Sequence, residues 1–133
     1  MLYKPSGYTS VAPYLVVSDA KATIAFLLAA FDGELIQTME APDGRVRHAE
    51  VRIDDTVVML GDSAPGWPPV PAHVHIYLPD VDTAFVRALG AGGTAVQEPE
   101  QKGDPDRRGG VSDPGGTTWW IATRGGVAPM VSS

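Results

Sequence analysis

The sequence predicts an α+β fold made of two βαβββ modules in tandem, and two observations support this. First, a strand-like run over residues 14–19 ends at an aspartate, and a similar run over residues 75–80 does the same 61 positions later. Such internal repetition is a primary indication of a duplicated architecture. Second, the 133 residues, 44% of them hydrophobic, suit one compact domain over residues 1–133 with its own core.

The first module is expected over residues 8–62. Its strand at residues 14–19 ends at Asp19, which is suited to cap a following helix. Apolar residues then recur at helical spacing: Ile24, Leu27, Leu28 and Phe31. Asp32 and Gly33 end this helix. Three strand-like runs follow, over residues 34–40, 45–54 and 56–61.

A proline-rich connector over residues 63–71 separates this module from the second, expected over residues 72–124. After Asp80, apolar residues again recur at helical spacing: Val81, Ala84, Phe85 and Leu89. Strand-like runs follow over residues 94–99, 108–112 and 117–123. The polar stretch 98–107, rich in Pro and Gly, is interpreted as a mobile flap over a cleft.

Strand periodicity predicts which side chains face a ligand. Alternate residues of a strand point to opposite faces, and the aliphatic row is expected to pack on the helices. The polar and aromatic rows then share the other face, and the repeat register places Trp119 toward the helices and Trp120 away from them. The candidate ligand-binding residues are Tyr14, His48, Glu50, His73, His75, Tyr77 and Trp120.

Composition excludes several classes of partner. A formal charge of −6 and a pI near 4.8 disfavour nucleic acid and anionic membranes, which are bound through clustered Lys and Arg. The chain has no cysteine, so disulfides, thiolate metal sites and cysteine nucleophiles are absent. No apolar run approaches the roughly 20 residues of a membrane helix, and we expect a cytoplasmic location.

Three segments resemble one known superfamily. They are residues 12–19 (APYLVVSD), residues 48–62 with HAEVRI and VMLGD, and above all residues 110–123 (GVSDPGGTTWWIAT). They are similar to the PhnB-like branch of the vicinal oxygen chelate superfamily, which includes glyoxalases, bleomycin resistance proteins and extradiol dioxygenases. The resemblance implies a U-shaped mixed-sheet cup, usually within a homodimer.

The resemblance also implies four metal-ligand positions, and most of them hold the wrong residue type. By the same alignment they fall on Ala12, Met59, His73 and Trp120. Because one ligand of four survives, and metal affinity comes from converging donors, we expect no cofactor at the usual site. A divalent metal held by a shifted set, His48, Glu50 and His75, remains open.

Several of these residues allow other readings. His73 is a leftover ligand position, an anchor for a bound molecule or a hydrogen-bonded residue at a strand start. His48 and Glu50 are site residues or solvated partners of Arg47 or Arg52. Trp120 lines the cup or belongs to the core or a dimer contact. Arg107 and Arg108 clamp an anion or lie in a solvated loop.

Two functions that involve a small molecule remain open, and a purely structural role is the third alternative. The first is metal-free binding of a small organic ligand, cationic or neutral, as in antibiotic or toxin sequestration. The second is an enzyme, either a metal-dependent lyase, isomerase or dioxygenase on a shifted ligand set, or a metal-free enzyme with a histidine or Glu50 as general base. We expect a homodimer, because apolar residues such as Trp67 and Phe31 need covering. The tail over residues 125–133 is expected to fray or to lie along the partner.

Overall fold

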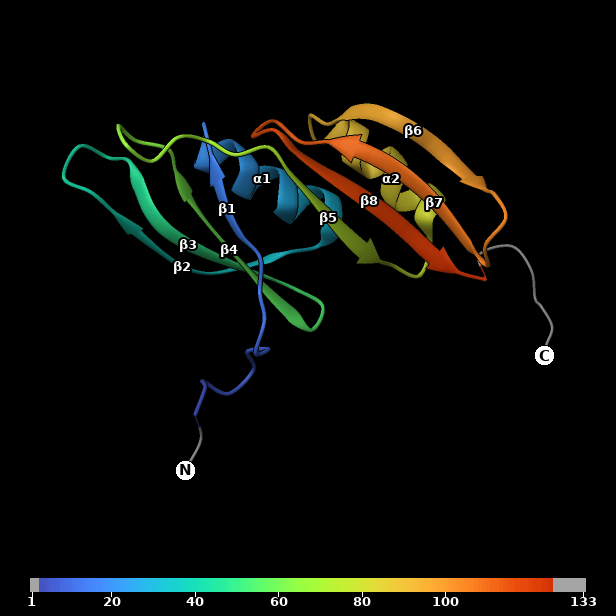
Figure 1. The fold of residues 1–133 in the computed structure, drawn as a ribbon, viewed down its shortest axis with the longest axis horizontal. Helices are drawn as coiled ribbons and strands as arrows, with labels where there is room; N and C mark the ends of the chain where they lie inside the picture. Colours follow the sequence, from blue (N-terminus) through green and yellow to red (C-terminus); the bar gives the residue numbers. More distant parts are fainter. Residues whose placement is uncertain (1–2, 126–133) are drawn as a thin grey trace.

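The computed structural model describes residues 3–125, and these residues form two βαβββ modules (Figure 1). The expectation for the tail falls, except for Gly125, outside the described residues. The first module contains β1 (Tyr14–Val17), α1 (Ala20–Phe31), β2 (Glu34–Glu40), β3 (Val46–Ile53) and β4 (Thr56–Asp62). The second contains β5 (Ala72–Tyr77), α2 (Val81–Gly90), β6 (Thr94–Gln101), β7 (Asp106–Ser112) and β8 (Thr117–Arg124).

Each module forms its own four-stranded mixed sheet, in the orders β1-β4-β3-β2 and β5-β8-β7-β6. The first strand of each module pairs parallel with the last, and the other pairs are antiparallel. Figure 1 shows the two sheets next to each other, with β1 and β5 on the sides that face one another. The α+β fold with tandem modules is therefore confirmed.

The strand registers show how closely the modules repeat. Tyr14 lies opposite Met59, and His75 lies opposite Trp120, so the offset of 61 positions holds for these strands. Met59 also pairs with Glu50, whereas Trp120 pairs with Gly110, so the offset on the neighbouring strands is one residue smaller. Structurally, therefore, Glu50 corresponds to Gly110.

Both helices begin at the aspartates that the sequence indicates. The Asp19 carboxylate accepts a hydrogen bond from the Ala22 amide, and the Asp80 carboxylate accepts one from the Thr83 amide. These bonds satisfy amide groups that have no partner inside the helix. Helix α1 ends at Asp32 in a left-handed conformation (φ 55°), as expected for a C-terminal cap.

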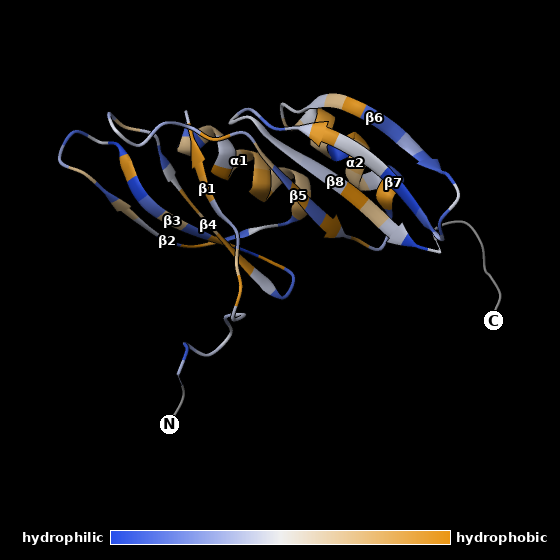
Figure 2. Ribbon diagram, in the orientation of Figure 1, coloured by the Kyte–Doolittle hydropathy of each residue, from blue (hydrophilic) through white to orange (hydrophobic). Residues whose placement is uncertain are grey.

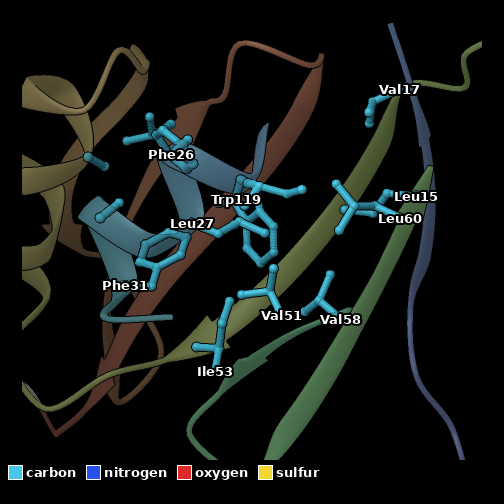
Figure 3. Packing of buried hydrophobic residues seen from close by; sticks show 14 of the residues in the cluster. Leu15, Val17, Phe26, Leu27, Phe31, Val51, Ile53, Val58, Leu60 and Trp119 are labelled. Carbon is cyan, nitrogen blue, oxygen red and sulfur yellow. The ribbon is translucent and has the colours of Figure 1, made fainter. Parts of the chain in front are cut away.

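A single hydrophobic core joins the two modules (Figure 3). The ring of Phe31 on α1 lies 5.2 Å from that of Trp119 on β8 and 5.7 Å from that of Phe26. Arg87 of α2 binds Asp32 at the end of α1 at 2.8 Å, so the helices are also tied at the surface. The expectation that Phe31 needs covering by a partner is wrong, because this core already buries it to 5% exposure.

The predicted flap over residues 98–107 is also wrong. Strand β6 continues through Gln101 and β7 begins at Asp106, so the connection spans only residues 102–105. The ladder continues because Glu100 pairs with Arg108 and Gln101 with Arg107. The proline at position 99 is tolerated because β6 is an edge strand and its register shifts between Gln97 and Glu100.

The hydropathy of the residues differs between the elements of the fold (Figure 2). Strand β6 becomes hydrophilic toward its C-terminal end, whereas α1 and β1 carry mainly hydrophobic residues. Among residues 3–125, no helix has the length and apolar character needed to cross a membrane.

Candidate functional site

Each of the seven candidate residues lies directly beside a core or core-packed residue in its strand, so the side chains point to the sheet faces opposite the core. Contacts divide them into two groups. The first group, on the first sheet, is Tyr14, His48 and Glu50. The second group, on the second sheet, is His73, His75, Tyr77 and Trp120. Within residues 3–125, no hydrogen bond or ring contact joins the two groups.

The first group is centred on the carboxylate of Glu50, which is only 5% exposed. His48 Nε2 lies 2.8 Å from Glu50 Oε2, and the hydroxyl of Tyr8 donates a hydrogen bond to Glu50 Oε1. Tyr14 stacks on His48 with 5.7 Å between ring centroids. Sequence reasoning missed Tyr8, which comes from the segment before β1 and has no motif around it.

The alternative that pairs His48 and Glu50 with Arg47 or Arg52 is wrong. The Arg52 guanidinium donates instead to the carbonyl oxygen of Gly7 at 2.7 Å. That contact holds the N-terminal segment against the first sheet. A pocket of about 460 Å³ lies beneath the segment, with Tyr8 and Glu50 among its lining residues.

Glu50 is held as a carboxylate. Burial raises the pKa of Glu50, but hydrogen bonds from His48, Tyr8 and Gln37 outweigh it, and the net pKa is below the ordinary value. The bond to Glu50 in turn raises the pKa of the Tyr8 hydroxyl, so this hydroxyl keeps its proton. A carboxylate with a lowered pKa is a weaker base, so the lowered pKa argues against Glu50 as a general base. The same negative charge makes the Glu50 carboxylate well suited to contact a cationic group.

The second group contains a flat aromatic surface. The indole Nε1–H of Trp120 donates to His73 Nδ1 at 3.0 Å, and the two ring planes differ by 11° with centroids 6.2 Å apart. Near-parallel rings joined through their edge nitrogens lie side by side rather than face to face. Gly110 lies under the indole, where a Cβ would come within 2.6 Å of it. Trp120 and His73 thus form one platform, which we call the Trp120–His73 platform.

A polar network borders this platform. Arg108 Nε donates to His75 Nε2 at 3.1 Å, and its terminal nitrogen Nη2 lies 3.2 Å from the Asp106 carboxylate. The Tyr77 hydroxyl donates to the same carboxylate at 2.6 Å, and this bond raises the pKa of Tyr77. Partial removal of the ring from water, followed by the charge of Arg108, lowers the pKa of His75 despite the opposing charge of Asp106. His75 is therefore held neutral.

The two adjacent arginines do not form a clamp. Arg107 makes two hydrogen bonds to Asp82 of α2, at 2.8 and 2.9 Å, on the helix side of the sheet. Arg108, the next residue in the strand, points to the opposite face and reaches His75. Both expectations for this pair, a joint clamp and a solvated loop, are wrong because successive strand residues alternate in direction.

The four metal positions implied by the resemblance do not fit a divalent ion. Ala12 and Trp120 provide no ligand atom, and the thioether of Met59 suits soft metals only. His73 is the remaining ligand, but its Nδ1 lone pair already accepts the indole N–H of Trp120. Among residues 3–125, no group of three or more His, Cys, Asp or Glu residues is arranged to hold a metal.

A further groove of about 320 Å³ opens between the modules beside the second group. His75 and Tyr77 line it together with residues of the β3–β4 hairpin, among them Val58. A groove of this size suits a small ligand or part of a larger one. The second group therefore lies beside a cavity as well as forming a flat surface.

Fold and site together define a class: a two-module α+β protein whose sheets carry polar and aromatic side chains on the faces opposite the core. A model of the Glyoxalase/Bleomycin resistance protein/Dioxygenase superfamily matches residues 8–121. The chain therefore belongs to this superfamily. Membership of the PhnB-like branch stays a prediction.

Individual proteins that are similar to this chain agree with the superfamily assignment and the fold. An uncharacterized protein of Mycobacterium bovis is 38% identical over 121 residues, covering 83% of this chain and 80% of the relative. The crystal structure of TioX from Micromonospora sp. ML1 is similar with a TM-score of 0.75 and 23% identity, over 87% of this chain and 98% of that one. TnmS3, an antibiotic binding protein from Streptomyces sp. CB03234, gives a TM-score of 0.68 and 21% identity over 88% and 99%. At these identities the two structures show the shared fold alone.

Proposed function

We propose that this protein binds a small organic ligand without a metal, in the manner of an antibiotic- or toxin-sequestering protein. One observation carries the proposal. The position expected for a metal-binding carboxylate holds Trp120, and its indole N–H occupies the lone pair of the one surviving ligand, His73. The site is thus built as an aromatic surface with polar borders, which is a common form of small-molecule site.

Charge supports a cationic or neutral ligand. The protein carries a formal charge of −6, and the buried Glu50 carboxylate lies on the ligand-binding face of the first sheet. TnmS3, which shares the fold, is an antibiotic binding protein, so a binding role is compatible with this scaffold. In this proposal the protein works in the cytoplasm and has neither nucleic acid nor membrane as a partner.

The proposal includes a homodimer. No hydrogen bond or ring contact joins the two residue groups in the described part of one chain, so a complete cup would combine the first group of one copy with the second group of another. Trp67 and Val70 between the modules are 51% and 56% exposed, and an apolar partner surface would cover them. Light scattering after size exclusion should give the dimer mass, and a monomer at all concentrations would contradict this part.

The binding function is tested by metal analysis together with ligand screening. Protein reconstituted with nickel, zinc and manganese should retain no stoichiometric ion, and these ions should not raise the unfolding temperature of wild type or of His73→Ala. A panel of planar neutral and cationic compounds should then quench the fluorescence of wild-type protein but not of Trp120→Ala. A near-stoichiometric ion, lost in His73→Ala, would refute the metal-free proposal and favour the metal-dependent enzyme.

A further inference from the structure

The hydrogen bonds around the second group fix which nitrogen of each histidine carries the proton. An indole N–H can only donate, so His73 Nδ1 accepts from Trp120 and the proton of the neutral ring is on Nε2. A guanidinium also only donates, so His75 Nε2 accepts from Arg108 and the proton is on Nδ1. Each ring has used its single lone pair within the protein.

We infer that the Trp120–His73 platform selects planar neutral rings that carry a hydrogen-bond-accepting oxygen, such as an aromatic ketone, over rings that carry only donors or none. This inference rests on the proposed function and names its ligand class. His73 and His75 both lie exposed on this face, and each offers a ligand an N–H and no lone pair. An acceptor oxygen is the group that such a surface complements.

The charges nearby favour a neutral acceptor over an anion. The Arg108 guanidinium has two carboxylate partners, Asp104 and Asp106, both at 3.2 Å. Arg124 lies 3.5 Å from Asp106 as well. Because Arg108 is already neutralised by these partners, little uncompensated positive charge remains for a carboxylate ligand.

The glycine beneath the platform explains why the ligand should be planar. With no Cβ on Gly110, the indole of Trp120 lies against β7, and its side chain remains partly exposed to solvent. Glu50 occupies the corresponding place in the first module, where Met59 replaces the indole. The flat surface therefore belongs to the second sheet alone.

A matched pair of probes tests the selection. 2-Acetylnaphthalene and 2-ethylnaphthalene share the same rings and nearly the same shape, but only the first has an accepting oxygen. Each is titrated into ¹⁵N-labelled wild-type protein while the indole N–H resonance of Trp120, identified by its loss in Trp120→Phe, is followed. One hydrogen bond corresponds to a preference of about threefold to tenfold for the acetyl compound.

Variants then locate the preference. His73→Phe keeps a flat ring but loses the N–H. The ratio of the affinities for the acetyl and ethyl compounds should therefore approach one in His73→Phe, or in the double variant His73→Phe/His75→Phe if both histidines contribute. Trp67→Phe changes an exposed indole outside both groups and should leave the ratio unchanged. Equal binding of the two probes to wild type, or a preference that survives both histidine substitutions, would overturn the inference while leaving the proposed function intact.

Two further readouts keep the test decisive. Long-range ¹H–¹⁵N spectra of the wild-type imidazoles should show the proton of His73 on Nε2 and that of His75 on Nδ1, and the opposite tautomers would overturn the inference even if a variant fails to fold. If neither probe shifts the Trp120 resonance, the proposed platform fails together with the inference.

Discussion

Replacing Gly110 by alanine should disrupt the platform at a predictable cost. The new Cβ would lie 2.6 Å from Cζ3 and 2.9 Å from Cε3 of Trp120, where ordinary contact begins at 3.4 Å. The ring must therefore move away from β7, and such overpacking costs about 1–3 kcal/mol. Alanine also has less conformational freedom than glycine in the unfolded chain, and this difference stabilises the variant by about 0.5–1 kcal/mol. We expect Gly110→Ala to lower the free energy of unfolding by about 1 kcal/mol, and by no more than about 2.5 kcal/mol.

Urea denaturation measures this difference, and the indole N–H resonance of Trp120 reports whether the ring moves and releases His73. The matched control is Gly90→Ala at the end of α2, where a Cβ meets nothing within 4 Å. That variant should be neutral or more stable by up to about 1 kcal/mol. Unchanged stability and an unshifted Trp120 resonance in Gly110→Ala would refute the argument that the glycine exists to seat the indole.

Three further predictions concern the charged groups. Because the pKa of Glu50 is lowered on folding, the carboxylate stabilises the fold above its ordinary pKa of 4.5, and this contribution is lost as the pH falls through the lower folded value. Wild type should therefore lose stability on acidification below about pH 4.5, and Glu50→Gln should lose less, as measured by urea denaturation across pH. Asp113→Ala should lower the free energy of unfolding by about 3 kcal/mol, because it leaves the indole N–H of the buried Trp119 and two backbone amides without an acceptor. A decrease below about 1 kcal/mol in thermal or urea unfolding would contradict this prediction. Arg87→Ala should leave the free energy of unfolding almost unchanged despite two hydrogen bonds to Asp32, because the pair is solvent-exposed. A clear loss of stability in the same assay would contradict this reasoning.

Periodicity was enough to predict the modules, their helices and the direction of most strand side chains. The aspartate caps and the strand and helix spacings are local patterns, each present once in either module, and the strand registers reproduce the offset of 61 positions at Tyr14 and His75. The alternation that placed Trp119 in the core and Trp120 on the opposite face is a property of any strand. Such features depend on residues close together in the chain.

The misjudged features depend on contacts between distant residues. Phe31 looked like a residue in need of a partner because the sequence does not show that α1 packs against β8 of the other module. Tyr8 carries no motif, and only the folded chain brings its hydroxyl to Glu50, 42 positions away. Arg107 and Arg108 were treated as one loop pair because the Pro- and Gly-rich residues before them concealed the continuing strands.

The shared core has a consequence for how the protein could be divided. Phe31 from the first module and Trp119 from the second bury one another, so neither half carries a complete hydrophobic interior. Unfolding of one half would expose the other half's apolar surface, and a single cooperative transition is the result to expect. Two fragments cut within residues 63–71 should each remain largely unfolded alone and recover the native fold when mixed, as a non-covalent complementing pair.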